Sequence, residues 1–355
     1  MVDLSFYKNK KVFITGHTGF KGSWLCHILK NEGAVIKGYS LRPEELPNLF
    51  QLSALDCDPQ IESVEGDIRD LDKLKKAVNT FQPEIMIHMA AQPLVRDSYD
   101  NPHYTYETNV MGTVNILEAL RSCKSVRSFL NVTTDKVYEN KEWVWGYREN
   151  EPLDGYDPYS NSKSCSELVT HSYQKSFFSG EATSVAISTA RAGNVIGGGD
   201  FAKDRIIPDC IRAAMNHKNI IVRNPHSTRP YQHVLEPLFA YLLILEKQYI
   251  QPERAGYYNV GPNEEDCITT GKLVGLFCEK WQKNQRWEDR FTGGPHEANF
   301  LKLDCSHIKT VLGWQPRWNV ETAIEKTVEW TKCYQEKEDI RQIMKVQIDA
   351  FIANK

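Results

Sequence analysis

The sequence predicts an α/β protein in which a Rossmann-type, doubly wound parallel sheet is joined by a smaller, mixed C-terminal lobe. Two observations favour this fold. In the first half, short apolar runs alternate with amphipathic helical runs, which is the pattern of a parallel sheet covered by helices on both faces. After Arg191 the alternation weakens, and Pro, Arg and His become frequent.

The elements of the first half follow from their hydrophobic periods. Strands are expected at residues 11–15, 35–39, 84–90, 128–133 and 184–189. Helices are expected at 20–32, 104–123 and 159–177. The first helix has Phe20, Trp24 and Ile28 on one stripe, and Gly33 follows it as a stop.

We expect residues 1–190 to form the sheet domain and residues 191–355 to form mainly the second lobe. Two short apolar segments, at 220–222 and 257–260, are expected to return to the main sheet. The boundary is soft, because a chain of 355 residues also fits one large domain.

The composition argues against several classes of function. A formal net charge of −3 does not favour a nucleic-acid or anionic-membrane partner. The longest apolar runs, such as residues 85–91, are too short to cross a bilayer, and the first residues lack the apolar core of a signal peptide. Nine cysteines, none in a CxxC pair, argue against a disulfide framework and a zinc site and suit a reducing cytoplasm.

A glycine-rich turn, TGHTGFKG (Thr15–Gly22), joins the first strand to the first helix. Gly16, Gly19 and Gly22 have the spacing GxxGxxG. Glycine permits a tight turn and lets a pyrophosphate approach backbone N–H groups at the helix N-terminus. The order of strand, turn and helix predicts that residues 1–190 bind a dinucleotide.

The residues expected near the adenosine half leave the choice of dinucleotide open. Where an acid would select the ribose 2′-hydroxyl of NAD, the sequence has GYSLRP (38–43), with no acid before Glu44. Arg42 could bind the 2′-phosphate of NADP, or it is a surface charge. Asp67 follows the third strand and could accept a hydrogen bond from the adenine amino group; a solvated turn is the alternative.

Two further stretches place acid–base groups near strand ends. Tyr159 and Lys163 are one helical turn apart, so the phenol and the ammonium can share a helix face. TTDKVYEN, after the fifth strand, supplies Thr134, Asp135 and Lys136. A Lys ammonium and a nicotinamide cation would lower the pKa of Tyr159, which could then take a proton from a substrate hydroxyl. Taken alone, each group also fits a solvated surface.

Five motifs together resemble the extended short-chain dehydrogenase/reductase family. They are TGHTGFKG, HMAAQ (88–92), NVMGT (109–113), TTDKVYEN and YSNSK (159–163). Within that family, four stretches resemble the sugar-nucleotide 4,6-dehydratases, most closely those acting on CDP-glucose: residues 143–163, 191–200, 229–234 and 295–298. The resemblance spans nearly the whole chain.

The resemblance implies an NAD-dependent dehydration of CDP-glucose with no net redox change. Tyr159, assisted by Thr134, would take the 4-hydroxyl proton while hydride leaves C4. Loss of the C5 proton and of the C6 hydroxyl, with Asp135 as the acid, gives an enone that takes the hydride back at C6. Lys163 would hold the nicotinamide ribose and tune Tyr159. The implied cofactor-binding residues are Gly16, Thr18, Gly19, Phe20, Gly22, Asp67, Ile68, Ala90, Tyr159 and Lys163.

One residue departs from the related dehydratases. They usually have a glutamate as the C5 base where this sequence has Lys136. A lysine is a base only when neutral, and its ordinary pKa is about 10.4. Desolvation and a nearby cation could depress that pKa, or a charged Lys136 could stabilise the enolate. Both roles stay open.

In the second lobe, the residues implied to hold the nucleotide diphosphate are Asn194, Arg205, Arg229 and His296. Arginine suits phosphate because its planar fork bonds two oxygens at once. In this family the helices at 104–122 and 160–177 usually pair with a second subunit. We therefore expect a homodimer through a four-helix bundle, or a tetramer that contains it.

Other functions on the same fold depend on the same residues. A GDP-mannose or dTDP-glucose type of dehydratase would differ in the substrate it binds. A sugar-nucleotide 4-epimerase needs Tyr159 and Lys163 but no C6 acid, so Asp135 argues against it. A non-catalytic dinucleotide sensor typically lacks the Tyr or the Lys, and both are present.

Overall fold

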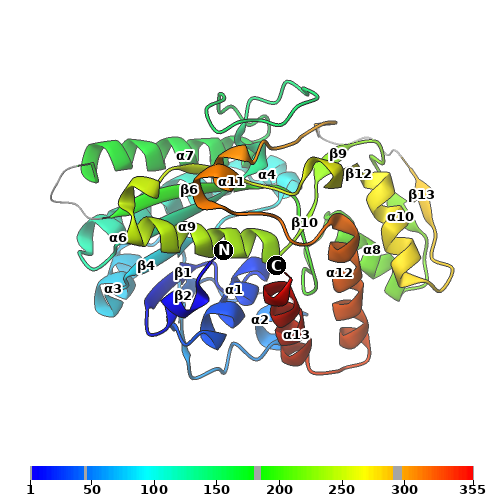
Figure 1. The fold of residues 1–355 in the computed structure, drawn as a ribbon, viewed down its shortest axis with the longest axis horizontal. Coiled ribbons are helices and arrows are strands. Elements are labelled where there is room, and N and C mark those ends of the chain that lie inside the picture. The colour runs from blue at the N-terminus through cyan, green and yellow to red at the C-terminus, as the bar shows by residue number, and fades with distance from the viewer. Residues whose placement is uncertain (1, 44–45, 180–184, 291–297, 355) are drawn as a thin grey trace.

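A seven-stranded parallel sheet forms the centre of the molecule (Figure 1). This computed structural model describes residues 2–43, 46–179, 185–290 and 298–354. The strand order is β11-β6-β5-β4-β1-β2-β3, and each neighbouring pair is parallel. The strands are β1 (Lys11–Thr15), β2 (Val35–Ser40), β3 (Ile61–Glu65), β4 (Ile85–His88), β5 (Ser128–Thr134), β6 (Ala186–Ala192) and β11 (Tyr257–Val260). The predicted α/β class and doubly wound sheet are confirmed.

Helices cover both faces of this sheet (Figure 1). The first layer contains α3 (Leu71–Phe81), α4 (Val95–Asp100), α5 (Pro102–Tyr106), α6 (Gly112–Ser122) and α7 (Pro158–Phe177). The second contains α1 (Phe20–Asn31), α2 (Leu49–Leu52), α9 (Leu235–Ile250), α11 (Ser306–Leu312) and α13 (Ile340–Ala353). In the first layer α6 packs against both α3 and α7, and in the second α1 contacts α2, α9 and α13.

Side chains of one strand enter two different cores. Val12 and Ile14 of β1 pack with the α1 and α9 layer, and Phe13 packs with the α3 and α6 layer. All three side chains are fully buried. Because strand side chains alternate between faces, a strand covered on both sides must be apolar throughout. This is the physical reason for the continuous apolar run at residues 12–14, the centre of β1.

The helix predicted at residues 104–123 is interrupted. Residues Glu107–Met111 form a π-helical turn between α5 and α6. Inside that turn, the side chain of Asn109 accepts a hydrogen bond from the N–H of Gln92 at 2.8 Å and donates to its carbonyl at 3.0 Å. The predicted helix is confirmed in place, since residues 102–122 are helical throughout, but the hydrophobic period gave no sign of the π turn inside it.

One of the two segments predicted to return to the main sheet does so. β11 pairs with β6 at the edge of the sheet, as predicted for residues 257–260. The prediction for residues 220–222 was wrong: they form β8 (Ile220–Val222), which pairs with β13 (Trp287–Asp289) in a separate sheet. The reason is that Ile220 and Val222 bury their side chains in the core of the second lobe.

The long apolar helix α9 comes from the second half of the chain but belongs to the main sheet. The amide of Gln248 donates to the Ser128 hydroxyl at 2.8 Å and to the carbonyl of Phe129 at 3.0 Å. These bonds tie α9 to the first residues of β5. The predicted division between residues 190 and 191 falls inside β6, which continues to Ala192.

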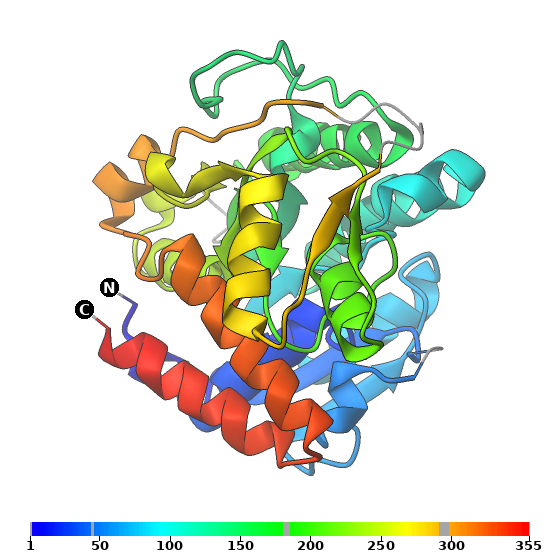
Figure 2. The same ribbon diagram turned by 90° about the vertical axis from the view of Figure 1, so that its right-hand side faces the viewer.

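Within the described residues, the second lobe contains three α-helices and three short strand pairs (Figure 2). Its helices are α8 (Ile206–Met215), α10 (Thr270–Trp281) and α12 (Val320–Gln335). The strand pairs are β8 with β13, β7 (Val195–Ile196) with β10 (Gln232–His233), and β9 (Thr228–Pro230) with β12 (Cys267–Thr269). In Figure 2, α10 in yellow and α12 in orange lie toward the viewer.

The turn between β1 and α1 is closely packed at Gly22. A Cβ added there would lie 2.3 Å from the carbonyl oxygen of Gly16 and 2.6 Å from the Cα of His17. By contrast, a Cβ added at Gly275 in α10 would have no neighbour within 4 Å. Both glycines are helical, so helix propensity alone favours alanine at each.

We therefore expect Gly22→Ala and Gly275→Ala to have opposite effects. Gly22→Ala should lower the free energy of unfolding by about 1–3 kcal/mol, because the backbone must move to admit the methyl group. Gly275→Ala should raise it by about 0.4–1 kcal/mol, because the unfolded chain loses freedom. Urea unfolding of both variants measures this. Equal changes in the two variants would contradict the packing argument.

Candidate active site

The strand order reverses at β1, which pairs with β2 on one side and β4 on the other. Ligands of open α/β sheets bind in the crevice that such a reversal creates at the carboxyl ends of the strands. Gly16, directly after β1, has φ +77°, and a Cβ there would lie 2.8 Å from the backbone nitrogen of Ala90 after β4. Only glycine combines this backbone conformation with this approach.

The first turn of α1 is free to hold an anion. Gly19 is the N-cap residue, and no described side chain caps the helix. The N–H groups of the first helical turn have no partner inside a helix, so they suit a phosphate. The predicted dinucleotide-binding turn therefore has three features that suit a pyrophosphate: its backbone conformation, its close packing and the N–H groups at the start of the helix.

The outer predicted cofactor residues lie at the ends of β2 and β3. The Thr18 hydroxyl is 2.8 Å from the Ser40 hydroxyl, so the end of β2 presents two hydroxyl groups rather than a carboxylate. Asp67 follows β3 and forms an ion pair of 2.7 Å with Arg69. Ile68 is 5% exposed, and its side chain belongs to the core. Its backbone is the part left to contact a ligand. Glu44 lies outside the described residues.

The start of α7 fixes the Tyr159–Lys163 pair. The carboxylate of Asp157 accepts a hydrogen bond from the N–H of Ser160 at 3.0 Å and caps the helix. Tyr159 therefore lies in the first turn and Lys163 one turn later. The ammonium of Lys163 is 5% exposed and donates to the carbonyl oxygen of Val132 on β5 at 3.3 Å.

Burial acts on both groups of this pair. It lowers the pKa of Lys163 to about 8, against an opposing effect of Glu167. It raises the pKa of Tyr159 to about 12, against hydrogen bonding by Thr134 and the charge of Arg205. The sequence predicted a lowered pKa for Tyr159. For the protein's own groups this was wrong, because burial disfavours the phenolate more than neighbouring cations favour it.

The loop after β5 brings Thr134, Asp135 and Lys136 into one short 3-10 turn. The Thr134 hydroxyl donates to Oδ1 of Asp135 at 3.0 Å and accepts from the N–H of Lys136. Asp135 is 1% exposed, and its Oδ2 has no partner among the described residues. Burial raises the pKa of Asp135, against the opposing charge of Lys136. A raised pKa favours the protonated carboxyl, which is the form that can deliver a proton.

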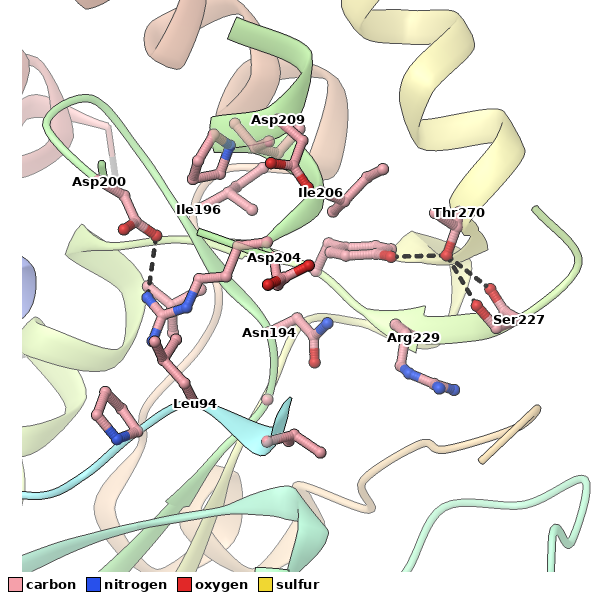
Figure 3. Close-up of a pocket in the computed structure, with 18 of the residues that line it drawn as sticks. Leu94, Asn194, Ile196, Asp200, Asp204, Ile206, Asp209, Ser227, Arg229 and Thr270 are labelled. Atoms are coloured by element: carbon pink, nitrogen blue, oxygen red, sulfur yellow. Dashed lines mark hydrogen bonds and ion pairs between the residues drawn. The ribbon is translucent and has the colours of Figure 1, made fainter. Parts of the chain in front are cut away.

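A cavity of about 570 Å³ lies between the sheet and the second lobe. The predicted site residues that line it are Phe20, Thr134, Asp135, Lys136, Tyr159, Asn194, Arg205 and Arg229. Figure 3 shows Asn194 and Arg229 on different segments of its wall. The structure thus brings four of the predicted acid–base residues and three of the predicted diphosphate residues to one cavity, whereas Lys163 is buried and is not part of the lining.

The two cavity arginines are held differently. Arg205 donates to Asp200 Oδ2 at 3.0 Å, the bond dashed in Figure 3. Arg229 is 6% exposed and donates to the carbonyl oxygens of Thr228 and Ala298. The fourth predicted residue, His296, lies outside the described residues.

A family profile described as GDP-mannose 4,6 dehydratase matches residues 13–327. The chain belongs to this family. A CDP-glucose 4,6-dehydratase of Salmonella typhimurium is 46% identical over 357 aligned positions, which cover 99% of each chain. The resemblance to the extended short-chain dehydrogenases, inferred from motifs, is confirmed.

More distant relatives share the fold. A CDP-paratose 2-epimerase of Salmonella typhi is 26% identical and covers 90% of this chain and 99% of its own. The crystal structure of a dTDP-glucose 4,6-dehydratase from Bacillus anthracis in complex with NAD matches with a TM-score of 0.78 and 22% identity, over 93% of this chain and 98% of that one. At 22% sequence identity, this structural similarity shows a shared fold only.

Sequence reasoning missed Lys21, the second residue of α1. Its side chain lines the cavity, and burial together with the charges of Lys163 and Arg205 lowers its pKa to about 7. The signal was present, since a charged residue stands inside the glycine-rich motif. Lys21 adds a further basic group to the cavity that Asp135 lines.

Sequence reasoning also missed an ion-pair bridge across the cavity. Asp204 accepts from Arg223 at 3.0 Å, and Nη1 of Arg96 is 3.5 Å away. Arg96 belongs to α4 beside the sheet, whereas Arg223 follows β8 in the second lobe. No sequence pattern could predict this bridge, because its members come from three separate segments.

Proposed function

We propose that this protein dehydrates CDP-glucose to CDP-4-keto-6-deoxyglucose, with NAD as a bound hydride carrier. The observation that carries the proposal is the grouping of Tyr159, Thr134 and a buried, unpaired Asp135 oxygen on the wall of one cavity. The relative named CDP-glucose 4,6-dehydratase, 46% identical over 99% of both chains, supports the sugar nucleotide. The chain is in this view an enzyme of the hydro-lyase class.

The first step removes the 4-hydroxyl proton of the glucose. Tyr159 is the base, and Thr134, which acts on it by hydrogen bonding, positions the hydroxyl. When bound, NAD would accept the C4 hydride and return it at C6. Lys163 and Arg205 supply positive charge that favours the Tyr159 phenolate as the proton leaves.

The second step removes water across C5 and C6. The 4-ketone acidifies the C5 proton, and the departing C6 oxygen needs a proton. We assign that proton to Asp135, because burial favours its protonated form. Lys136 stands beside it and acts on the C5 proton or on the enolate.

Binding is divided between the two parts of the chain. Residues 1–190 bind the dinucleotide through the turn containing Gly16, Gly19, Gly22 and Phe20, with Thr18, Asp67, the Ile68 backbone and Ala90 at the strand ends. Residues 191–355 supply mainly the substrate site, where Asn194, Arg205, Arg229 and His296 hold the diphosphate. NADP stays an alternative, since the end of β2 has no carboxylate.

We propose a homodimer in which α5, α6 and α7 pair with those of a second copy as a four-helix bundle. Exposed apolar side chains support it: Met111, in the π-helical turn between α5 and α6, is 52% exposed, and Leu168 on α7 is 53% exposed. Sedimentation of the purified protein tests this, and a monomer at micromolar concentration would argue against the dimer.

A cytoplasmic location is proposed from the free cysteines. No helix in the described ranges has both the length and the hydropathy of a membrane span.

The proposed function is tested by incubating the purified protein, with NAD, with CDP-, dTDP-, UDP- and GDP-linked glucose and mannose. We expect ultraviolet absorbance of a 4-keto-6-deoxy product chiefly from CDP-glucose. Appearance of a 4-epimer without the keto product would identify an epimerase. Absence of both would contradict the proposal.

Asp135→Asn should stall the reaction after oxidation. The variant keeps the shape of the side chain but cannot protonate the departing C6 oxygen, so enzyme-bound NADH should accumulate on mixing with CDP-glucose. Tyr159→Phe is the matched control, since it should prevent NADH from appearing at all. Stopped-flow absorbance separates the two. Normal turnover of Asp135→Asn would remove the acid role.

Lys136→Met should slow elimination without affecting the first hydride transfer. The change removes the charge and the base and keeps an apolar stem. Exchange of the C5 hydrogen with deuterated water should slow by roughly 10²–10⁴-fold, the usual contribution of a positioned proton-transfer group. Restoration by Lys136→Glu would identify a base, and failure to restore would identify a charged stabiliser. Unchanged exchange would exclude Lys136 from the mechanism.

A further inference from the structure

A buried ion pair lies one helical turn after Lys163 and has no role in the chemistry proposed above. Glu167 is on α7, one helical turn after Lys163, and Arg191 is on β6. Nε of Arg191 is 2.9 Å from both carboxylate oxygens of Glu167, and Nη2 is 2.6 Å from Oε2. The side chains of Arg191 and Glu167 are only 3% and 1% exposed.

The carboxylate of Glu167 has further donors on both sides. The Thr133 hydroxyl on β5 donates to Oε1, and the Thr189 hydroxyl on β6 donates to Oε2 at 3.2 Å. Burial alone would lower the pKa of Arg191, but Glu167 raises it above the ordinary value. A buried pair with this number of hydrogen bonds is fixed in place.

The remaining amino group of Arg191 holds the segment that follows the acid–base loop. Nη1 donates to the Tyr138 hydroxyl at 2.8 Å and to the carbonyl oxygen of Glu149 at 3.0 Å. The Tyr138 hydroxyl donates in turn to Oδ1 of Asn259 on β11 at 2.6 Å. Arg191 therefore connects α7 to the chain immediately after Asp135 and Lys136.

The electrostatic setting of Lys163 depends on the same pair. The groups around it are Glu167 on its own helix, Lys21 on α1, His88 on β4 and, behind Glu167, Arg191 on β6. Burial and Lys163 hold the pKa of His88 near 3, so His88 is neutral. Glu167 is thus the one negative charge among these described groups, and Arg191 offsets part of it.

We propose that Glu167 and Arg191 are positioning residues: their opposed charges set the protonation of Lys163, and their hydrogen bonds fix the acid–base loop relative to α7. The catalytic role of this pair rests on the proposed function. Its effect on the protonation of Lys163 is independent of that function, because it concerns only groups of this chain. Removing the Glu167 charge should lower the pKa of Lys163, and removing the Arg191 charge should raise it.

The direct test measures the titration midpoint of the Lys163 ammonium. It records the ¹³Cε NMR resonance of lysine-labelled protein across the pH range, without added dinucleotide. Lys163→Arg assigns the resonance. The parent should titrate near pH 8. Glu167→Gln keeps the shape and removes the negative charge, so the midpoint should fall by about one unit or more. Arg191→Met leaves the Glu167 charge without its partner, so the midpoint should rise by about one unit.

A merely structural role would not give shifts of opposite sign. The double variant Glu167→Gln/Arg191→Met removes both charges, and buried pairs replaced together are often tolerated. Its midpoint should return to within about half a unit of the parent. If a single variant fails to fold, the double variant alone decides, and a large shift in it overturns the proposal. Unmoved midpoints in the folded single variants overturn it as well.

Glu246→Gln is the matched control. Glu246 is a buried glutamate of α9 that pairs with Lys247 at 2.9 Å. It lies near the first residue of β5, whereas Lys163 contacts Val132 toward the carboxyl end of that strand. The Glu246→Gln variant should have a lower free energy of unfolding and an unchanged Lys163 midpoint. The alkaline limb of kcat for CDP-glucose should follow the Lys163 midpoint in each variant. An inactive parent with the expected midpoints would reject the proposed function and leave this inference standing.

Discussion

The close approach of the turn after β1 to the end of β4 is the constraint on which the rest of the structure depends. β1 must pair on both sides, so the chain leaves it inside the sheet and not at an edge. Gly16 lies against Ala90, and Gly22 lies against Gly16, with no space for a side chain at either position. This packing sets where α1 begins. The buried face of α1 then receives α2, α9 and α13, which complete the second helical layer.

The same turn explains the charge balance of the cavity. Because α1 starts at the strand ends, Lys21 in its first turn reaches the cavity wall that Lys163 and Arg205 already make basic. Against them stands Asp135, buried and with one oxygen unpaired among the described residues. An excess of positive charge suits a doubly anionic diphosphate. A buried carboxyl with an unpaired oxygen in that field suits a step in which a hydroxyl must leave with a proton, whereas Asp200 and Asp204 on the same wall are paired with arginines.

Particular elements show where sequence reasoning was sufficient. The strand at residues 11–15, the glycine turn and the Tyr159–Lys163 pair were predicted correctly in place, because each depends on neighbours within one strand or one helical turn. Residues 220–222 were assigned to the wrong sheet, since an apolar triplet fits any covered strand. The π turn at Glu107–Met111 was missed, because Asn109 bonds to Gln92, which is distant in sequence.

The sequence by itself determined the alternation of strands and helices, the turn that fits a pyrophosphate and the set of candidate acid–base residues, because period, backbone freedom and residue type are local properties. The tertiary structure alone decided the protonation of those residues and their mutual placement. Burial raises the pKa of Tyr159 and of Asp135. Arg191 pairs with Glu167 of another element, and the Tyr138 hydroxyl links Arg191 to Asn259 of a third. Desolvation and long-range pairing depend on what surrounds a group in space, and no local pattern of residues records that.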